Sequence, residues 1–123
     1  MNAVIRAVIV GSLSLLMILS GVWLSRAGRP LNVGISTLHK LVALATGVYL
    51  LVTALQRNRM APLTAGEWIA VVVTGLFFVA MAATGGLLAS DKPAPVAVLR
   101  IHQILPALTV ASTGVTLFLL LGQ

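Results

Sequence analysis

The sequence predicts an all-α fold: an integral membrane four-helix bundle with up-down-up-down topology, built from two repeated helical hairpins. Hydrophobic residues make up 59% of the 123 residues and charged residues only 8%, too few to cover a soluble domain. Four apolar segments each have the roughly 20 residues needed to cross the hydrocarbon core of a bilayer. The links between these segments are short, which makes consecutive helices antiparallel neighbours.

The four segments form one transmembrane domain that covers residues 1–123. Because backbone N–H and C=O groups find no water inside a bilayer, we expect each segment to be an α-helix. The first segment is longer than the apolar core of a typical signal peptide, so we expect it to stay in the bundle. The expected helices are Ala3–Leu24, Ile35–Leu55, Glu67–Ala89 and Val96–Leu121.

Several residues mark the ends of these helices. Trp23 and Trp68 lie at segment ends, at the depth where aromatic side chains meet lipid headgroups. Thr64 and Glu67 have the spacing of a capping box, which predicts the start of the third helix. Pro95 is predicted to be the first residue of the fourth helix, where a missing N–H has little cost.

The two halves of the chain repeat each other at their polar positions. Ser20-Gly21 recurs as Thr84-Gly85, and His39 recurs as His102. The glycine pair belongs to the first and third segments, whereas the histidine pair belongs to the second and fourth segments. Matches among apolar residues are common by chance, so the paired glycines and histidines are the evidence for a repeated hairpin.

This topology predicts that the two histidines face each other. The second and fourth helices run in the same direction on one diagonal of the bundle, so His39 and His102 lie at similar depth, roughly 6–10 Å below the helix edge. Gly21 and Gly85 are level with them on the other diagonal, and glycine permits a close approach to the backbone. The arrangement fits a flat macrocycle held edge-on, with iron bound by two axial nitrogens.

Two cations lie near the histidines. Lys40 follows His39 directly, and Arg100 lies two residues before His102. Both are expected at the helix edge, where haem propionates would need cationic partners. The sequence therefore predicts a cofactor site made of His39, His102, Gly21, Gly85, Lys40 and Arg100, with the two histidines as metal ligands.

Histidine-bearing transmembrane helices with glycines on their companion helices resemble the four-helix membrane bundles of the cytochrome b type. This group includes the cores of quinol-oxidising complexes and ferric-reductase-like membrane proteins. The resemblance implies haem b and membrane electron transfer, with a quinone or a redox protein as partner. Family members often carry two haems, but the chain has only two histidines, so one bis-histidine haem is its maximum.

The expected protein is therefore an electron-transfer module rather than an enzyme. We expect it in a lipid bilayer, with the bacterial inner membrane as its location, inside a larger membrane complex or a homo-oligomer. Three other interpretations stay open. Each histidine can be an ordinary interfacial residue, each can bind a separate chlorin magnesium, or the chain can be a haem-free accessory or structural subunit. The glycines can equally serve close helix packing.

Composition excludes several other classes of protein. The chain has no cysteine, so disulfides, iron–sulfur clusters and covalent c-type haem attachment are excluded. Its net charge of +6 comes from residues at segment ends, where they meet lipid headgroups, so nucleic-acid binding is not expected. Neither acidic residue, Glu67 or Asp91, lies deep in a span, which argues against a proton relay.

Overall fold

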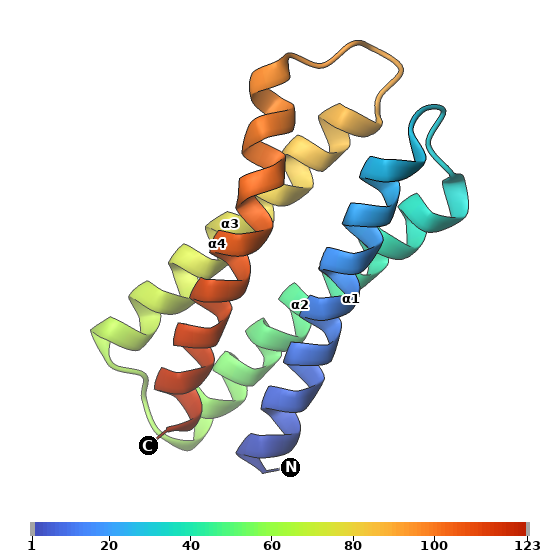
Figure 1. The fold of residues 1–123 in the computed structure, drawn as a ribbon. Helices are drawn as coiled ribbons and strands as arrows, with labels where there is room; N and C mark the ends of the chain where they lie inside the picture. Colours follow the sequence, from blue (N-terminus) through green and yellow to red (C-terminus); the bar gives the residue numbers. More distant parts are fainter. Residues whose placement is uncertain (1, 123) are drawn as a thin grey trace.

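The computed structural model describes residues 2–122, which form four long helices side by side (Figure 1). The all-α prediction is therefore confirmed. Each helix is long and apolar enough to cross a membrane. The elements are α1 (Ala3–Ala27), α2 (Val33–Met60), α3 (Ala65–Ala89) and α4 (Val96–Leu121).

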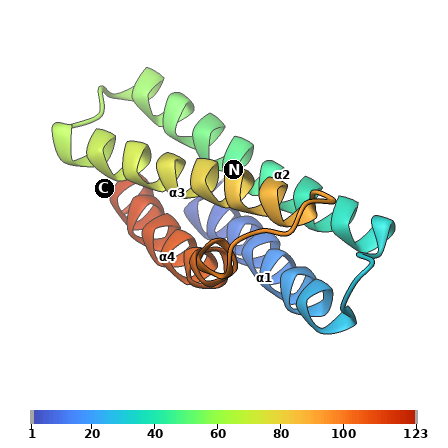
Figure 2. The same cartoon turned by 90° about the horizontal axis from the view of Figure 1, so that it is seen from above.

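The bundle consists of two hairpins. Helix α1 packs along α2, and α3 packs along α4, whereas the hairpins meet less extensively through the pairs α2–α3, α1–α4 and α2–α4. The links 28–32 and 90–95 lie at one end of the molecule (Figure 1). The link 61–64 and both chain ends lie at the other end. Figure 2, which views the bundle from above, shows α1 beside α4 and α2 beside α3.

The first two helices extend beyond the predicted ranges. Helix α1 continues to Ala27 and stops at Gly28, whose φ of 76° is a conformation that suits glycine. Helix α2 begins after Asn32, whose side chain accepts a hydrogen bond from the Ile35 N–H, and runs through a polar last turn to Met60. Hydropathy locates only the apolar part of a helix. The backbone of α2 stays helical up to Ala61, which is extended because it precedes Pro62.

The residues predicted to mark the starts of the last two helices agree with the structure for α3 but not for α4. The capping box is confirmed: the Thr64 side chain accepts from the Glu67 N–H, and the Glu67 side chain accepts from the Thr64 N–H at 2.7 Å. Pro95 is the N-cap residue of α4 instead of its first helical residue. Its ψ of 144° is extended, so the helix begins one residue later, at Val96.

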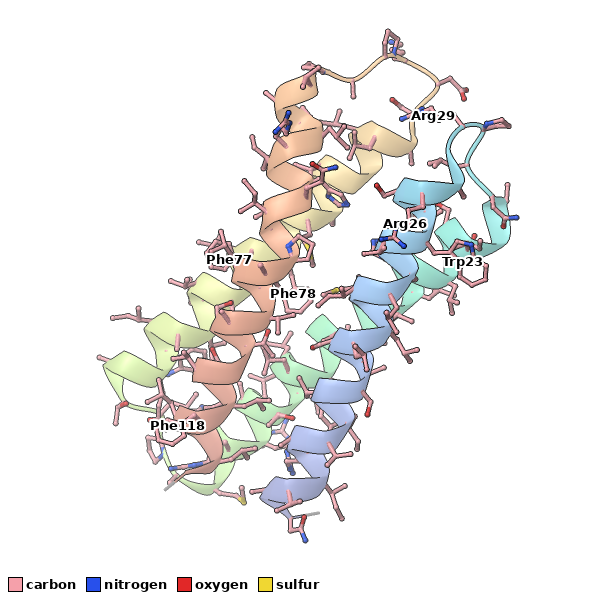
Figure 3. All side chains as sticks on the ribbon, viewed as in Figure 1. Trp23, Arg26, Arg29, Phe77, Phe78 and Phe118 are labelled. Atoms are coloured by element: carbon pink, nitrogen blue, oxygen red, sulfur yellow. The ribbon has the colours of Figure 1, made fainter. Side chains whose placement is uncertain are left out.

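The core is thin and lies along the bundle axis. One cluster takes a buried residue from each helix: Met17, Val42, Met81 and Leu105. Phe78 of α3 lies between the hairpins, with its ring 3.5 Å from the position that a Cβ on Gly47 would occupy (Figure 3). Large apolar side chains also cover the outside of every helix, as expected for a surface that faces lipid.

The hairpins are also joined at the end that carries the links 28–32 and 90–95. There the Arg29 guanidinium donates a hydrogen bond to the Leu88 carbonyl in the last turn of α3, and Figure 3 shows Arg29 at this end. Helix C-terminal carbonyls lack intrahelical partners, so a cation placed there is favourable.

Candidate functional site

The two histidines lie next to each other in the bundle. The ring centroids of His39 and His102 are 6.5 Å apart, and the ring planes cross at 76°. Both residues are half-buried, and they come from α2 and α4, the diagonal pair of helices that are in contact. The structure thus brings together the two side chains that the sequence analysis predicted to be metal ligands.

The imidazole of His39 is held by the companion helix of its own hairpin. Its Nδ1 lies 3.1 Å from the Met17 carbonyl oxygen and 3.0 Å from Ser20 Oγ. A carbonyl only accepts hydrogen bonds, so Nδ1 carries the proton. The Ser20 hydroxyl is free to accept because its own proton goes to the Leu16 carbonyl at 2.7 Å. This hydrogen-bond pattern assigns His39 to the Nδ1–H tautomer.

His102 is held in the same way in the second hairpin. Its Nδ1 lies 2.7 Å from Thr84 Oγ1, and the Thr84 hydroxyl donates to the Ala80 carbonyl at 2.8 Å. With its proton on the Ala80 carbonyl, the Thr84 hydroxyl accepts from the ring, and this pattern gives His102 the Nδ1–H tautomer as well. The repeat seen in the sequence is thus also a repeat of contacts.

Both Nε2 atoms keep their lone pairs. Within residues 2–122, neither Nε2 has a hydrogen-bond partner, whereas both Nδ1 atoms do. Histidines that bind metals commonly donate their other ring N–H to a carbonyl or another acceptor, which fixes the tautomer and the ring orientation. In both imidazoles, Nε2 is thus the nitrogen that is left to accept a further bond.

The two glycines lie against the imidazole rings. A Cβ on Gly21 would be 3.1 Å from His39 Cε1, and a Cβ on Gly85 would be 3.1 Å from His102 Cε1. Contacts this short would force the ring to move. The space beside each glycine, expected from the sequence to border a macrocycle, holds the imidazole of the same hairpin.

Lys40 and Arg100 are both exposed, in contrast to the half-buried histidines. Each helical residue turns the chain by about 100°, so Lys40 points to a different side of α2 from His39. Arg100 is about 200° from His102 around α4. The structure does not gather these two cations around the imidazoles as it gathers the glycines.

The distance between the ring centres can be compared with the one that a shared metal would require. Metal–imidazole bonds of about 2.0–2.1 Å place the centres of two opposed rings about 6 Å apart, close to the separation seen here. Within the described part of the chain, no group of three or more His, Cys, Asp or Glu residues could hold a metal ion. Two imidazoles alone suit a haem iron, because the macrocycle supplies the remaining nitrogens.

Sequence reasoning missed the role of Ser20 and Thr84. The available signal was that a hydroxyl residue stands directly before each paired glycine. Two other hydroxyl residues, Thr46 and Thr109, each stand seven residues after one of the histidines. Both are fully buried, and each donates to the carbonyl four residues earlier in its own helix.

Comparison of the chain with protein-family models, with curated proteins and with solved structures found no match.

Proposed function

We propose that this protein is an integral membrane b-type cytochrome that binds one haem b between His39 and His102. The observation that carries the proposal is the 6.5 Å separation of two imidazoles whose Nδ1 atoms are both already bonded. Both Nε2 atoms then remain for the iron.

The residues of the chain would each have a defined task. His39 and His102 would supply the axial nitrogens, one from each hairpin, and Ser20 and Thr84 would hold the rings. Bound haem would supply reversible one-electron chemistry at its iron. The buried Met17 and the other apolar side chains of the core would keep water away, and low polarity around a redox centre influences its potential.

In the cell, the protein would cross the bilayer four times in an up-down-up-down arrangement and act as an electron-transfer module. With both histidines near one end of the bundle, the haem would lie close to one membrane surface. One haem near one surface suits electron exchange with a quinone or a redox protein, within a larger complex of the bacterial inner membrane. Lys40 and Arg100 would lie near the propionates only if their flexible side chains bend toward the site.

Absorption spectroscopy tests the proposal. The purified protein is expected to be red and to show a sharp reduced-minus-oxidised band after dithionite. His39→Ala and His102→Ala should each lose this band, because each removes one axial nitrogen. Gln103→Ala changes an exposed neighbour on α4 and should keep the band, so it is the matched control. Full bands in both histidine variants would contradict the ligand assignment.

A second candidate is a haem-free accessory subunit, and one feature favours it. A groove of about 660 Å³ runs between α1 and α4, lined partly by the small residues Gly11, Ser14 and Gly114. Small residues at a helix surface permit close packing of another transmembrane helix. This candidate predicts no bound pigment, even after the purified protein is incubated with excess haemin.

A further inference from the structure

The two histidines are held by unequal sets of acceptors, although the hairpins repeat each other. The His39 Nδ1–H has two acceptors, the Met17 carbonyl at 3.1 Å and Ser20 Oγ at 3.0 Å. The His102 Nδ1–H has one, Thr84 Oγ1 at 2.7 Å. The position equivalent to Met17 in the second hairpin is Met81. Its carbonyl lies 3.2 Å from the Thr84 hydroxyl, as the Met17 carbonyl lies 3.1 Å from the Ser20 hydroxyl, but among the described residues it has no hydrogen bond with His102.

This difference matters because the two kinds of acceptor respond differently to mutation. The Met17 carbonyl belongs to the backbone, so no side-chain substitution removes it, and His39 keeps an anchor without Ser20. His102 depends on a side-chain hydroxyl alone. Loss of that hydroxyl leaves its Nδ1–H without a partner in a partly buried site, which favours rotation of the ring or a change of tautomer.

We propose that Thr84 is the positioning residue that keeps His102 available as the second axial ligand, and that Ser20 only supplements the carbonyl anchor of His39. The inference rests on the proposed haem function for its consequences at iron. The difference between the hydrogen-bond partners of His39 and His102 exists in the haem-free protein and can be tested there. Removal of an outer partner of a metal-binding histidine commonly weakens metal binding about 10- to 100-fold.

The matched pair of variants is Ser20→Ala and Thr84→Val, since each removes one hydroxyl without adding a polar group. Thr84→Val should weaken haem binding about 10- to 100-fold, whereas Ser20→Ala should change it less than 10-fold. The reduced Thr84→Val protein should bind carbon monoxide, because a released His102 opens one position on the iron. Wild type and Ser20→Ala should not bind it. Thr84→Ser keeps the hydroxyl and should restore the wild-type behaviour.

A measurement on the haem-free protein tests the anchors separately. Nitrogen NMR of labelled histidine should show the Nδ1–H tautomer for both residues in wild type. Ser20→Ala should leave His39 unchanged, and Thr84→Val should alter His102 alone. If Thr84→Val does not fold, Thr84→Ala removes the same hydroxyl with a smaller side chain and should alter His102 in the same way.

Each outcome has one meaning. An Nε2–H tautomer for His102 in wild type, or equal responses of the two variants, would overturn the inference about Thr84. Absence of haem binding in wild type would instead overturn the proposed function. In that case the NMR result would still decide whether the anchors differ.

Discussion

Gly21 and Gly85 each lie against the imidazole of the neighbouring helix, with the ring Cε1 3.1 Å from the position of an added Cβ. Even the Cβ of alanine would push the ring by a few tenths of an ångström, and a larger side chain would displace it further and break its hydrogen bond to Ser20 or Thr84. This contact explains at the residue scale why the two glycines and the two histidines recur together in the sequence.

In the proposed cytochrome, Gly85→Val is accordingly expected to abolish most haem binding, because the larger side chain moves His102. The adjacent Gly86→Val is the control, because a Cβ there meets nothing within 4 Å and the helix-propensity cost is the same. The measurement is the reduced-minus-oxidised band per mole of purified protein. Equal bands in the two variants would show that Gly85 does not position the ring.

The crossed imidazole planes give a spectroscopic prediction. Axial imidazoles that cross near a right angle leave two iron d orbitals almost equal in energy. In the proposed haem complex, rings that keep the 76° between His39 and His102 should therefore produce one strongly low-field line in the ferric EPR spectrum. A three-line rhombic spectrum, typical of parallel rings, would mean that the rings turn when haem binds.

At the scale of single helices, hydroxyl side chains supply contacts that apolar packing cannot supply in lipid. Thr74 and Thr116 are fully buried, and their hydroxyl oxygens lie 2.9 Å apart between α3 and α4. Thr116 also donates to the Ala70 carbonyl at 3.2 Å. This small network ties the second hairpin together far from the histidines.

Thr116→Val should therefore destabilise the bundle by roughly 0.6–2 kcal/mol, the range found for hydrogen bonds between membrane helices. Unfolding in a denaturing detergent, followed by circular dichroism, measures the change. Val115→Thr is a control at an exposed position of the same helix and should have almost no effect. Equal stability of wild type and Thr116→Val would mean that these hydrogen bonds make no net contribution to the free energy of unfolding.

Much of the fold and part of the site could be predicted from the sequence. Length and hydropathy located all four helices, but the end of α2 was missed by five residues because Gln56–Met60 is polar yet still helical. The pairing of His39 with His102 followed from topology. The roles of Ser20 and Thr84 could not be predicted, since a hydroxyl inside a helix usually bonds only to its own backbone.

At the scale of the whole molecule, the arrangement of links and ends makes membrane topology measurable. The chain contains no cysteine, so a single introduced cysteine is a unique label. Ala27→Cys and Ser90→Cys lie at one end of the bundle, and Ala61→Cys lies at the other (Figure 1). In sealed vesicles, a membrane-impermeant maleimide should label the first two from the same side and the third from the opposite side. Labelling of all three from one side would contradict four crossings.

The two hairpins pack less extensively against each other than the two helices pack within each hairpin. Lipid tails can replace apolar protein contacts at little cost, so this boundary is the weakest part of the molecule in a membrane. One histidine comes from each side of it. An iron atom bound by both histidines would therefore cross-link the two hairpins. Haem binding and the packing of the hairpins against each other would then be thermodynamically coupled.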